Sequence, residues 1–204
     1  MVDRRNTPGA PGTGGGPTDE ELLGRFLEGD REALAELVRR YERPIFSYLA
    51  RMLGGTAAAE DAFQEVCLRL VRGADSYEAG RLVRPWLYAI ATNVCRRQVA
   101  RRKRGRTILL GPPADEEEPG GLSEFPADAA SPVEVAERRE LAQLVREAVA
   151  ALTEHQREVF VLYQYQGLTY VEIARAVGRP LGTVKSDMFF ALRTLRRRLE
   201  RHWR

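Results

Sequence analysis

The stretch from Gly167 to Ser186 decides the fold, and it reads Gly-Leu-Thr-Tyr-Val-Glu-Ile-Ala-Arg-Ala-Val-Gly-Arg-Pro-Leu-Gly-Thr-Val-Lys-Ser. Thr169 is followed three residues later by Glu172, which is typical of a capping box and predicts a helix that begins at Tyr170. The apolar residues of this helix recur at helical spacing and are expected to form its inner face. They are Val171, Ala174 and Val177, with Ile173 beside them.

A sharp turn is predicted after this helix. Gly178 can adopt the left-handed conformation of a helix C-cap, and Pro180 cannot continue the preceding helix. Gly182 gives the turn further freedom, and a second helical pattern resumes at Thr183. Two short helices joined this tightly are typical of a helix-turn-helix, whose second helix enters a DNA groove.

The second helix has two different faces when its residues are placed at about 100° each. One face is apolar and is expected to be core: Val184, Met188, Ala191, Leu195 and Leu199. The other carries donors, cations and aromatic rings: Lys185, Ser186, Phe189, Phe190, Arg193 and Arg197. Such side chains can contact phosphates, guanine edges and thymine methyl groups. A solvated basic face of another all-α protein remains the alternative.

Basic residues gather in two separate segments. Nine Lys or Arg and no acidic residues lie between Arg81 and Arg106, and six Arg against one Glu lie between Arg193 and Arg204. Two basic segments are typical of a protein that touches nucleic acid at two places, and solvated helix faces are the alternative. No apolar run of membrane-spanning length and no signal segment occurs, so we expect a soluble cytoplasmic protein.

The sequence favours a binding protein over an enzyme. It contains no phosphate-binding loop, no nucleophile elbow and no paired carboxylates beside a histidine, so no catalytic residues are expected. Cys67 and Cys95 lack metal-ligand spacing, and the only histidines are His155 and His202. We therefore expect no metal and no cofactor, and we expect both cysteines to behave as small hydrophobic residues.

The pattern of helices and breakers predicts an all-α fold of two small helical domains joined by an acidic flexible linker. Residues 1–17 are rich in Gly and Pro and are expected to form a disordered tail. The first domain is expected at 18–104, with capping signals at Thr18 and Asp30, a helix over 57–72 and a helix that has Pro85 in its first turn. The acidic, Pro-containing linker is expected at 105–131, and the second domain, which contains the helix-turn-helix, at 132–204. Capping boxes at Ser131 with Glu134 and at Thr153 with Gln156 are expected to begin the first two helices of that domain.

Several motifs resemble the extracytoplasmic-function (ECF) sigma factors of bacterial RNA polymerase, over residues 19–200. Leu152-Thr-Glu-His-Gln-Arg-Glu-Val-Phe-Val-Leu162, with the helix-turn-helix, resembles region 4 of that family. Glu60-Asp-Ala-Phe-Gln-Glu-Val66 resembles region 2.2, and Arg84-Pro-Trp-Leu-Tyr-Ala-Ile-Ala-Thr-Asn93 resembles regions 2.3 and 2.4. Two motif sets in the family's order, with an acidic linker between them, are more specific than either alone.

The resemblance implies three sites. In region 2, one surface is expected to bind core RNA polymerase: Asp61, Gln64, Glu65 and Leu68. The helix after the 76–84 loop is expected to recognise and help melt the −10 element of promoter DNA, through Trp86, Asn93, Arg96 and Arg97. The outward side of that helix is expected to hold Ala89, Thr92 and Ala100 as well. Trp86 could equally pack beneath the loop.

Region 4 is expected to read the −35 element through Thr183, Lys185, Ser186, Phe189, Phe190 and Arg193. Two positions depart from the family pattern, because Asp187 and Phe190 stand where relatives usually carry Arg. Losing two cations is expected to weaken −35 binding and to flatten its salt dependence. The linker would either thread through the polymerase or act as a solubilising tether. An anti-sigma factor is an expected partner by family analogy.

The leading hypothesis is therefore a sigma factor that binds core RNA polymerase and directs promoter-specific initiation. A stand-alone helix-turn-helix regulator is the competing hypothesis, with the first domain used for dimerisation or signal input. Such a regulator has no need of an acidic docking surface at Asp61, Gln64 and Glu65. A nucleic-acid-processing enzyme is the third hypothesis, and the missing catalytic residues disfavour it.

Overall fold

A computed structural model describes residues 16–78, 80–108 and 132–200, and within these ranges the chain forms helices and no strands. The N-terminal helices are α1 (Asp19–Leu27), α2 (Arg31–Leu53), α3 (Thr56–Gly73), the 3-10 helix η2 (Ala74–Ser76) and α4 (Val83–Ile108). The C-terminal helices are α5 (Pro132–Ala150), α6 (Glu154–Gln164), α7 (Tyr170–Val177) and α8 (Leu181–Leu199). The predicted all-α fold with two helical domains is confirmed.

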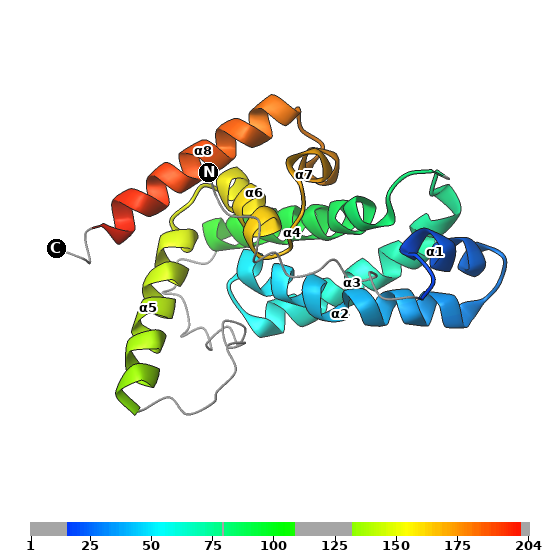
Figure 1. The fold of residues 1–204 in the computed structure, drawn as a ribbon, viewed down its shortest axis with the longest axis horizontal. Helices are drawn as coiled ribbons and strands as arrows, with labels where there is room; N and C mark the ends of the chain where they lie inside the picture. The colour runs from blue at the N-terminus through cyan, green and yellow to red at the C-terminus, as the bar shows by residue number, and fades with distance from the viewer. Residues whose placement is uncertain (1–15, 79, 109–131, 201–204) are drawn as a thin grey trace.

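The N-terminal domain packs the helices α1, α2, α3 and α4 around an apolar centre. The helix α2 lies against α1, α3 and α4, and α3 also packs on α4 (Figure 1). Buried residues recur at helical spacing along each of them, because one face of every helix turns inward. Tyr48 and Leu49 of α2, Val66 of α3 and Leu87 and Tyr88 of α4 are all at most 2% exposed.

The C-terminal domain is built around the helix-turn-helix. The helices α6 and α7 pack on α8, and α5 also contacts α8 while its far end projects away from the other helices (Figure 1). The predicted inner face of α8 is confirmed, since Val184, Met188, Ala191 and Leu195 are buried. The opposite face of α8 is thereby left to solvent.

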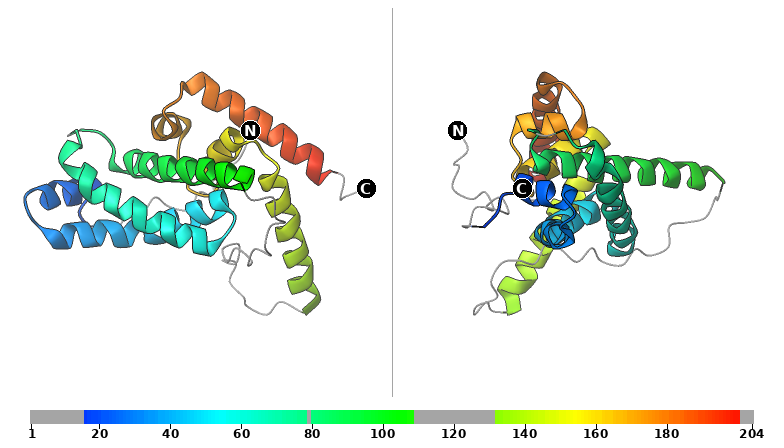
Figure 2. Two further views of the ribbon diagram at one scale, coloured as in Figure 1. Left: turned by 180° about the vertical axis from the view of Figure 1, so that it is seen from behind. Right: turned by 90° about the vertical axis from the view of Figure 1, so that its right-hand side faces the viewer.

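The two domains also pack against each other, a contact that the sequence did not predict. The helix α7 lies along α4, and α6 touches α2. Figures 1 and 2 show α7 between α4 and the beginning of α8. Most of the predicted linker and tail, residues 109–131 and 1–15, lies outside the described residues. The helix α4 continues to Ile108, beyond the end at 104 that was predicted for the first domain.

Helix ends agree with the capping signals. Capping boxes form at Thr18, Thr153 and Thr169, and the Asp30 side chain accepts hydrogen bonds from two backbone N–H groups. Gly178 ends α7 with a φ of +67°, in the left-handed region that only glycine adopts without strain. The predicted box at Ser131 lies outside the described residues.

Two details of the helix-turn-helix differ from expectation. Val171 is 49% exposed, whereas Ile173, Ala176 and Val177 are buried. Val171 lies about 200° around the helix from Ile173, so it cannot share the face that packs on the N-terminal domain. The second helix begins at Leu181, with Pro180 at its N-cap, two residues before the predicted start.

The capping box at Thr169 allows a direct stability test. Its hydroxyl accepts from the Glu172 N–H at 3.3 Å, and its own N–H donates to the Glu172 carboxylate at 2.8 Å. Because Thr169 is exposed, Thr169→Ala removes the cap without removing core contacts, and we expect the free energy of unfolding to fall by about 1 kcal/mol. Urea unfolding followed by circular dichroism measures this, with Thr169→Ser as the matched control. Equal losses in both variants would contradict the capping role.

Candidate functional site

The outer face of α8 presents every predicted −35 residue to solvent. Thr183, Lys185, Ser186, Phe189, Phe190 and Arg193 are all exposed. Phe189 and Phe190 are 62% and 48% exposed, and their rings meet edge to face with centroids 5.4 Å apart. Exposed aromatic rings beside exposed cations suit a surface that contacts bases and phosphates at once. Leu192, 53% exposed, extends this apolar patch and was not predicted.

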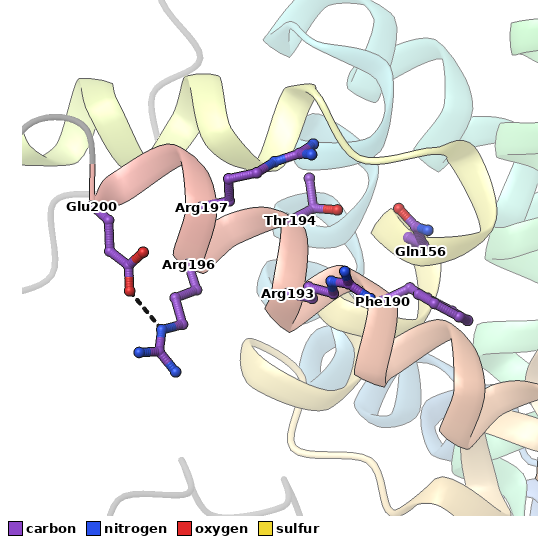
Figure 3. A pocket seen from close by; sticks show the side chains of 7 residues that line it. All are labelled: Gln156, Phe190, Arg193, Thr194, Arg196, Arg197 and Glu200. Atoms are coloured by element: carbon purple, nitrogen blue, oxygen red, sulfur yellow. Dashed lines mark hydrogen bonds and ion pairs between the residues drawn. The ribbon is translucent and has the colours of Figure 1, made fainter.

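A groove lies beside this face, where the N-terminal end of α6 approaches α8 (Figure 3). Its volume is about 380 Å³, and it is lined by Gln156, Phe190, Arg193, Thr194, Arg196, Arg197 and Glu200. Arg196 donates to Glu200 at 2.6 Å, as the dashed line in Figure 3 shows. Arg193 and Arg197 have no such ion pair among the described residues, so their charges are available to an anion.

Asp187 does not belong to the exposed face of α8. Its carboxylate accepts from the guanidinium of Arg179 in the turn, and both side chains are at most 20% exposed. The acid, at a position where the family resemblance implies Arg, thus ties the turn to α8. The ion pair with Arg179 gives a structural reason for an acid at position 187, which the sequence alone did not indicate.

We expect Asp187→Ala to lower the free energy of unfolding by about 1–3 kcal/mol, because Arg179 then loses its charged partner in a half-buried place. Asp187→Asn, which keeps an oxygen acceptor, should lose less, and Asp187→Arg should lose most because two cations would face each other. Thermal unfolding of the three variants gives the ranking. A ranking that placed Asp187→Arg nearest the wild type would contradict the ion pair.

The predicted polymerase-binding residues lie in a row on the outside of α3. Asp61, Gln64 and Leu68 are exposed, and Leu68 is 51% exposed. Glu65 is half-buried and accepts from Arg69 at 2.6 Å, so part of its charge is neutralised within the helix. Val71, 48% exposed and three residues after Leu68, lengthens the apolar part of the row. Because Val71 follows Leu68 by three residues, helical spacing could have indicated that both lie on the same face of α3.

The predicted −10 residues separate into two groups in the structure. Asn93 and Arg97 are exposed on α4. Trp86 is half-buried and packs on Tyr77 of the preceding loop, with ring centroids 5.2 Å apart. Trp86 therefore packs beneath that loop and supports it.

Arg96 lies in the contact between the domains. Its guanidinium donates to both carboxylate oxygens of Glu158 on α6, at 2.7 and 2.8 Å, and to the carbonyl oxygen of Val177 at 3.2 and 3.3 Å. The hydrogen bonds to Glu158 raise the pKa of Arg96. Glu158 itself is 0% exposed. An acid directly before the apolar run Val159–Leu162 was the sequence signal that could have indicated a buried partner.

Thr92 was wrongly predicted to face outward. It is 0% exposed and shares a hydrogen bond of 3.0 Å with the hydroxyl of Tyr48 on α2. A threonine methyl packs like a valine, and the hydroxyl satisfies the buried tyrosine. Of the residues predicted on the outward surface of α4, the small Ala side chains, Asn93 and Arg97 therefore remain.

Among the described residues, no group of three or more His, Cys, Asp and Glu side chains could hold a metal ion. Burial raises the thiol pKa of Cys67 and Cys95, which fits small hydrophobic residues. None of the helices in the described ranges is long and apolar enough to cross a membrane.

Comparison with protein families matches both domains. Residues 37–105 match Sigma-70 region 2, and residues 142–195 match Sigma-70, region 4. A region 2 match is not expected of a stand-alone helix-turn-helix regulator, so that alternative is not favoured.

Curated relatives match over most of their length. The chain is 31% identical over 180 residues to the ECF RNA polymerase sigma factor SigW of Bacillus subtilis, covering 88% of this chain and 96% of that protein. It is 30% identical over 177 residues to the ECF RNA polymerase sigma-E factor of Escherichia coli K12, covering 85% and 90%.

Solved structures share the fold. CnrH, solved in complex with the cytosolic domain of CnrY, aligns with a TM-score of 0.65 at 22% identity, over 89% of this chain and 97% of that one. The sigma factor RpoE of Bartonella quintana, solved with the anti-sigma factor NepR, aligns with a TM-score of 0.64 at 21% identity, over 82% and 96%. The family matches, the relatives and the two-domain helical fold agree, and the chain belongs to the ECF sigma factors, which direct promoter-specific initiation by RNA polymerase.

Proposed function

We propose a division of labour among three helices of this sigma factor. The row on α3 formed by Asp61, Gln64, Glu65 and Leu68 docks on core RNA polymerase. The helix α4 binds the −10 element as the strands open, through Asn93 and Arg97, and also through Arg96 if its ion pair with Glu158 is broken. The helix α8 binds the −35 element. The observation that carries the proposal is that α8 leaves all its predicted contact residues exposed while its opposite face is buried.

Each surface has the chemistry that its role needs. An acidic row with an apolar centre at Leu68 fits a basic, partly apolar partner surface. Asn93 can pair with a base edge and Arg97 with a phosphate, and the small Ala side chains of α4 let a strand approach closely. Trp86, which braces the loop before α4, positions that surface. No step in this proposal makes or breaks a covalent bond, so the chain acts as an initiation factor and leaves catalysis to the polymerase.

Run-off transcription with core polymerase of the same bacterium tests the proposal. Sequencing RNA after overexpression identifies induced genes, and their shared upstream elements supply the promoter templates. We expect transcripts only when the chain is added, and we expect changes in the −35 or −10 element to abolish them. Failure to stimulate any induced promoter would overturn the assignment.

We also propose an inhibitory protein partner. Two proteins of the same fold, CnrH and RpoE, were each solved with a bound protein, and for RpoE that protein is an anti-sigma factor. On this chain Phe189, Phe190 and Leu192 form an exposed apolar patch that a partner could cover. Affinity purification of the tagged chain from its host, followed by mass spectrometry, tests this. The partner should be lost from Phe189→Ser, and its retention would argue against the patch.

A further inference from the structure

The helix α4 begins without a cap from its own sequence. The residue before it is Leu82, whose side chain has no polar atom. The helices α1, α6 and α7 instead begin with a capping box formed by the threonine that precedes each of them. The N–H groups in the first turn of a helix have no partner within the helix, so α4 needs an acceptor from elsewhere.

A carboxylate from α1 supplies that acceptor. The Oε1 atom of Glu20 accepts from the Val83 N–H at 2.9 Å, although the two residues lie sixty-three positions apart. Val83 is 0% exposed, and a buried N–H without a partner has a free-energy cost comparable to a lost hydrogen bond. The charge of Glu20 also lies at the positive end of the α4 dipole, where an anion is favourable. Glu20 thus caps the first turn of α4.

Neighbouring residues hold α1 in the place from which Glu20 reaches α4. Asp19 accepts from Arg40 of α2 at 3.1 Å and also from the hydroxyl of Tyr41. Glu21, on the other side, completes the capping box of α1. The first of three consecutive acids therefore anchors α1 to α2, the second reaches α4, and the third caps α1 itself.

The helix α1 also stabilises the segment between η2 and α4, because it packs on both of these elements (Figure 1). Within the segment, the Tyr77 hydroxyl donates to the Arg81 carbonyl oxygen, and the Tyr77 ring packs on Trp86 near the start of α4. Burial raises the pKa of Tyr77, and the carboxylate of Glu20 raises it further. Glu20 therefore lies near Tyr77 at one end of the segment and bonds to Val83 at the other.

We propose that Glu20 is a positioning residue for recognition of the −10 element. It touches no base itself: it fixes the start of α4, and with it Trp86 and Tyr77, in the shape that receives unpaired bases. Removing a base from the stack has a free-energy cost that protein contacts must offset, and a surface that is already ordered loses little further entropy on binding. This role of Glu20 rests on the proposed binding of the −10 element by α4.

The sign of the effect separates positioning from simple charge repulsion. Glu20 is exposed, so its charge acts through solvent near the surface proposed to bind DNA. If its charge alone mattered, removing the carboxylate would reduce repulsion from phosphates and strengthen binding. If Glu20 holds the start of α4, removing the carboxylate weakens the capture of −10 bases.

The variant Glu20→Ala, tested as the holoenzyme with core polymerase, removes the cap of α4. We expect the equilibrium for promoter opening, followed with a fluorescent adenine analogue in the −10 element, to fall about fivefold, as the loss of one helix cap implies. Glu20→Gln keeps an oxygen acceptor and should retain most of the opening. Glu21→Ala is the matched control, because it removes the same charge and a cap of α1 but leaves the bond to Val83. Its opening should stay at the wild-type level.

A second measurement uses the free protein and needs no DNA. The chain has two tryptophans, so Trp203→Phe leaves Trp86 as the only one. In that background Glu20→Ala should increase the quenching of Trp86 fluorescence by acrylamide, whereas Glu21→Ala should not. Circular dichroism establishes that each variant is folded. Unchanged quenching, an equal loss of opening in both alanine variants, or stronger opening in Glu20→Ala would overturn the positioning role.

Failure of this role and failure of the proposed function give different results. A wild-type holoenzyme that opens promoters equally well with and without the −10 element would refute the function proposed for α4. A wild-type holoenzyme that requires the −10 element, together with a Glu20→Ala variant that opens equally well, would refute the positioning role alone. The quenching result depends on neither, because it is measured without polymerase or promoter.

Discussion

Reversing one charge on α3, by Asp61→Lys, is expected to weaken binding to core RNA polymerase at least tenfold. Asp61 is exposed in the proposed docking row and has no ion pair with another described residue, so its carboxylate is available to a basic partner surface. A lysine there would place like charges against each other, which costs several kcal/mol at an interface, and each 1.4 kcal/mol corresponds to a factor of about ten. Competition with fluorescently labelled wild-type protein for core polymerase measures the loss.

The matched control is Glu28→Lys, which makes the same change of charge at the C-cap of α1, a helix that packs on α2 and α4. A lysine at the C-terminal end of a helix is favourable, so this control should not lose stability. Only the α3 variant should fail to compete and to support run-off transcription. Similar affinities for the two variants would mean that net charge, and not the α3 surface, governs docking.

Local signals in the sequence predicted the parts of this fold that depend on neighbouring residues. The boxes at Thr18, Thr153 and Thr169 formed as expected, because a cap joins residues three positions apart. Gly178 ended α7 because the required left-handed backbone is a property of that one position. The exposed face of α8 followed from periodicity alone.

Contacts between distant residues were not predicted. Thr92 is inward because Tyr48, forty-four positions earlier, offers a hydrogen bond, and periodicity cannot indicate that partner. Arg96 was taken as a free cation because Glu158 lies sixty-two positions away in the other domain. The helix α7 buries Ile173 and exposes Val171 because α4 covers one of its faces. In each case, the sequence does not indicate which distant residue or helix packs against the side chain.

The exposed cations of α8 are expected to contribute strongly to the affinity for promoter DNA. Removing two cations from α8, by Lys185→Ala with Arg193→Ala, is expected to weaken binding of the polymerase holoenzyme to its promoter about thirtyfold or more. Both side chains are exposed, and neither has an ion pair among the described residues, so each can reach a phosphate or a guanine edge. A good contact of that kind contributes about 1–3 kcal/mol, and two of them account for the expected factor.

Salt dependence separates phosphate contacts from base contacts. Each phosphate neutralised contributes about 0.9 to the slope of log affinity against log salt, so two lost phosphate contacts should reduce the slope by about 1.8. If Arg193 instead reads a base, its removal should relax the preference for the −35 sequence and reduce the slope by only about 0.9, from Lys185. Affinity measured from 50 to 200 mM salt, on promoters with intact and altered −35 elements, gives both quantities.

The control removes the same charge from another exposed helix. Arg138→Ala with Arg139→Ala takes two cations from α5, which contacts α8 through its other end and contributes no predicted DNA contact. If α5 changes the salt slope as much as α8 does, DNA attraction is a property of the domain's overall charge, and the recognition helix loses its special role. If only the α8 variant changes it, the exposed row from Thr183 to Arg193 binds the −35 element, and Asp187 can remain in that helix because Arg179 already neutralises it.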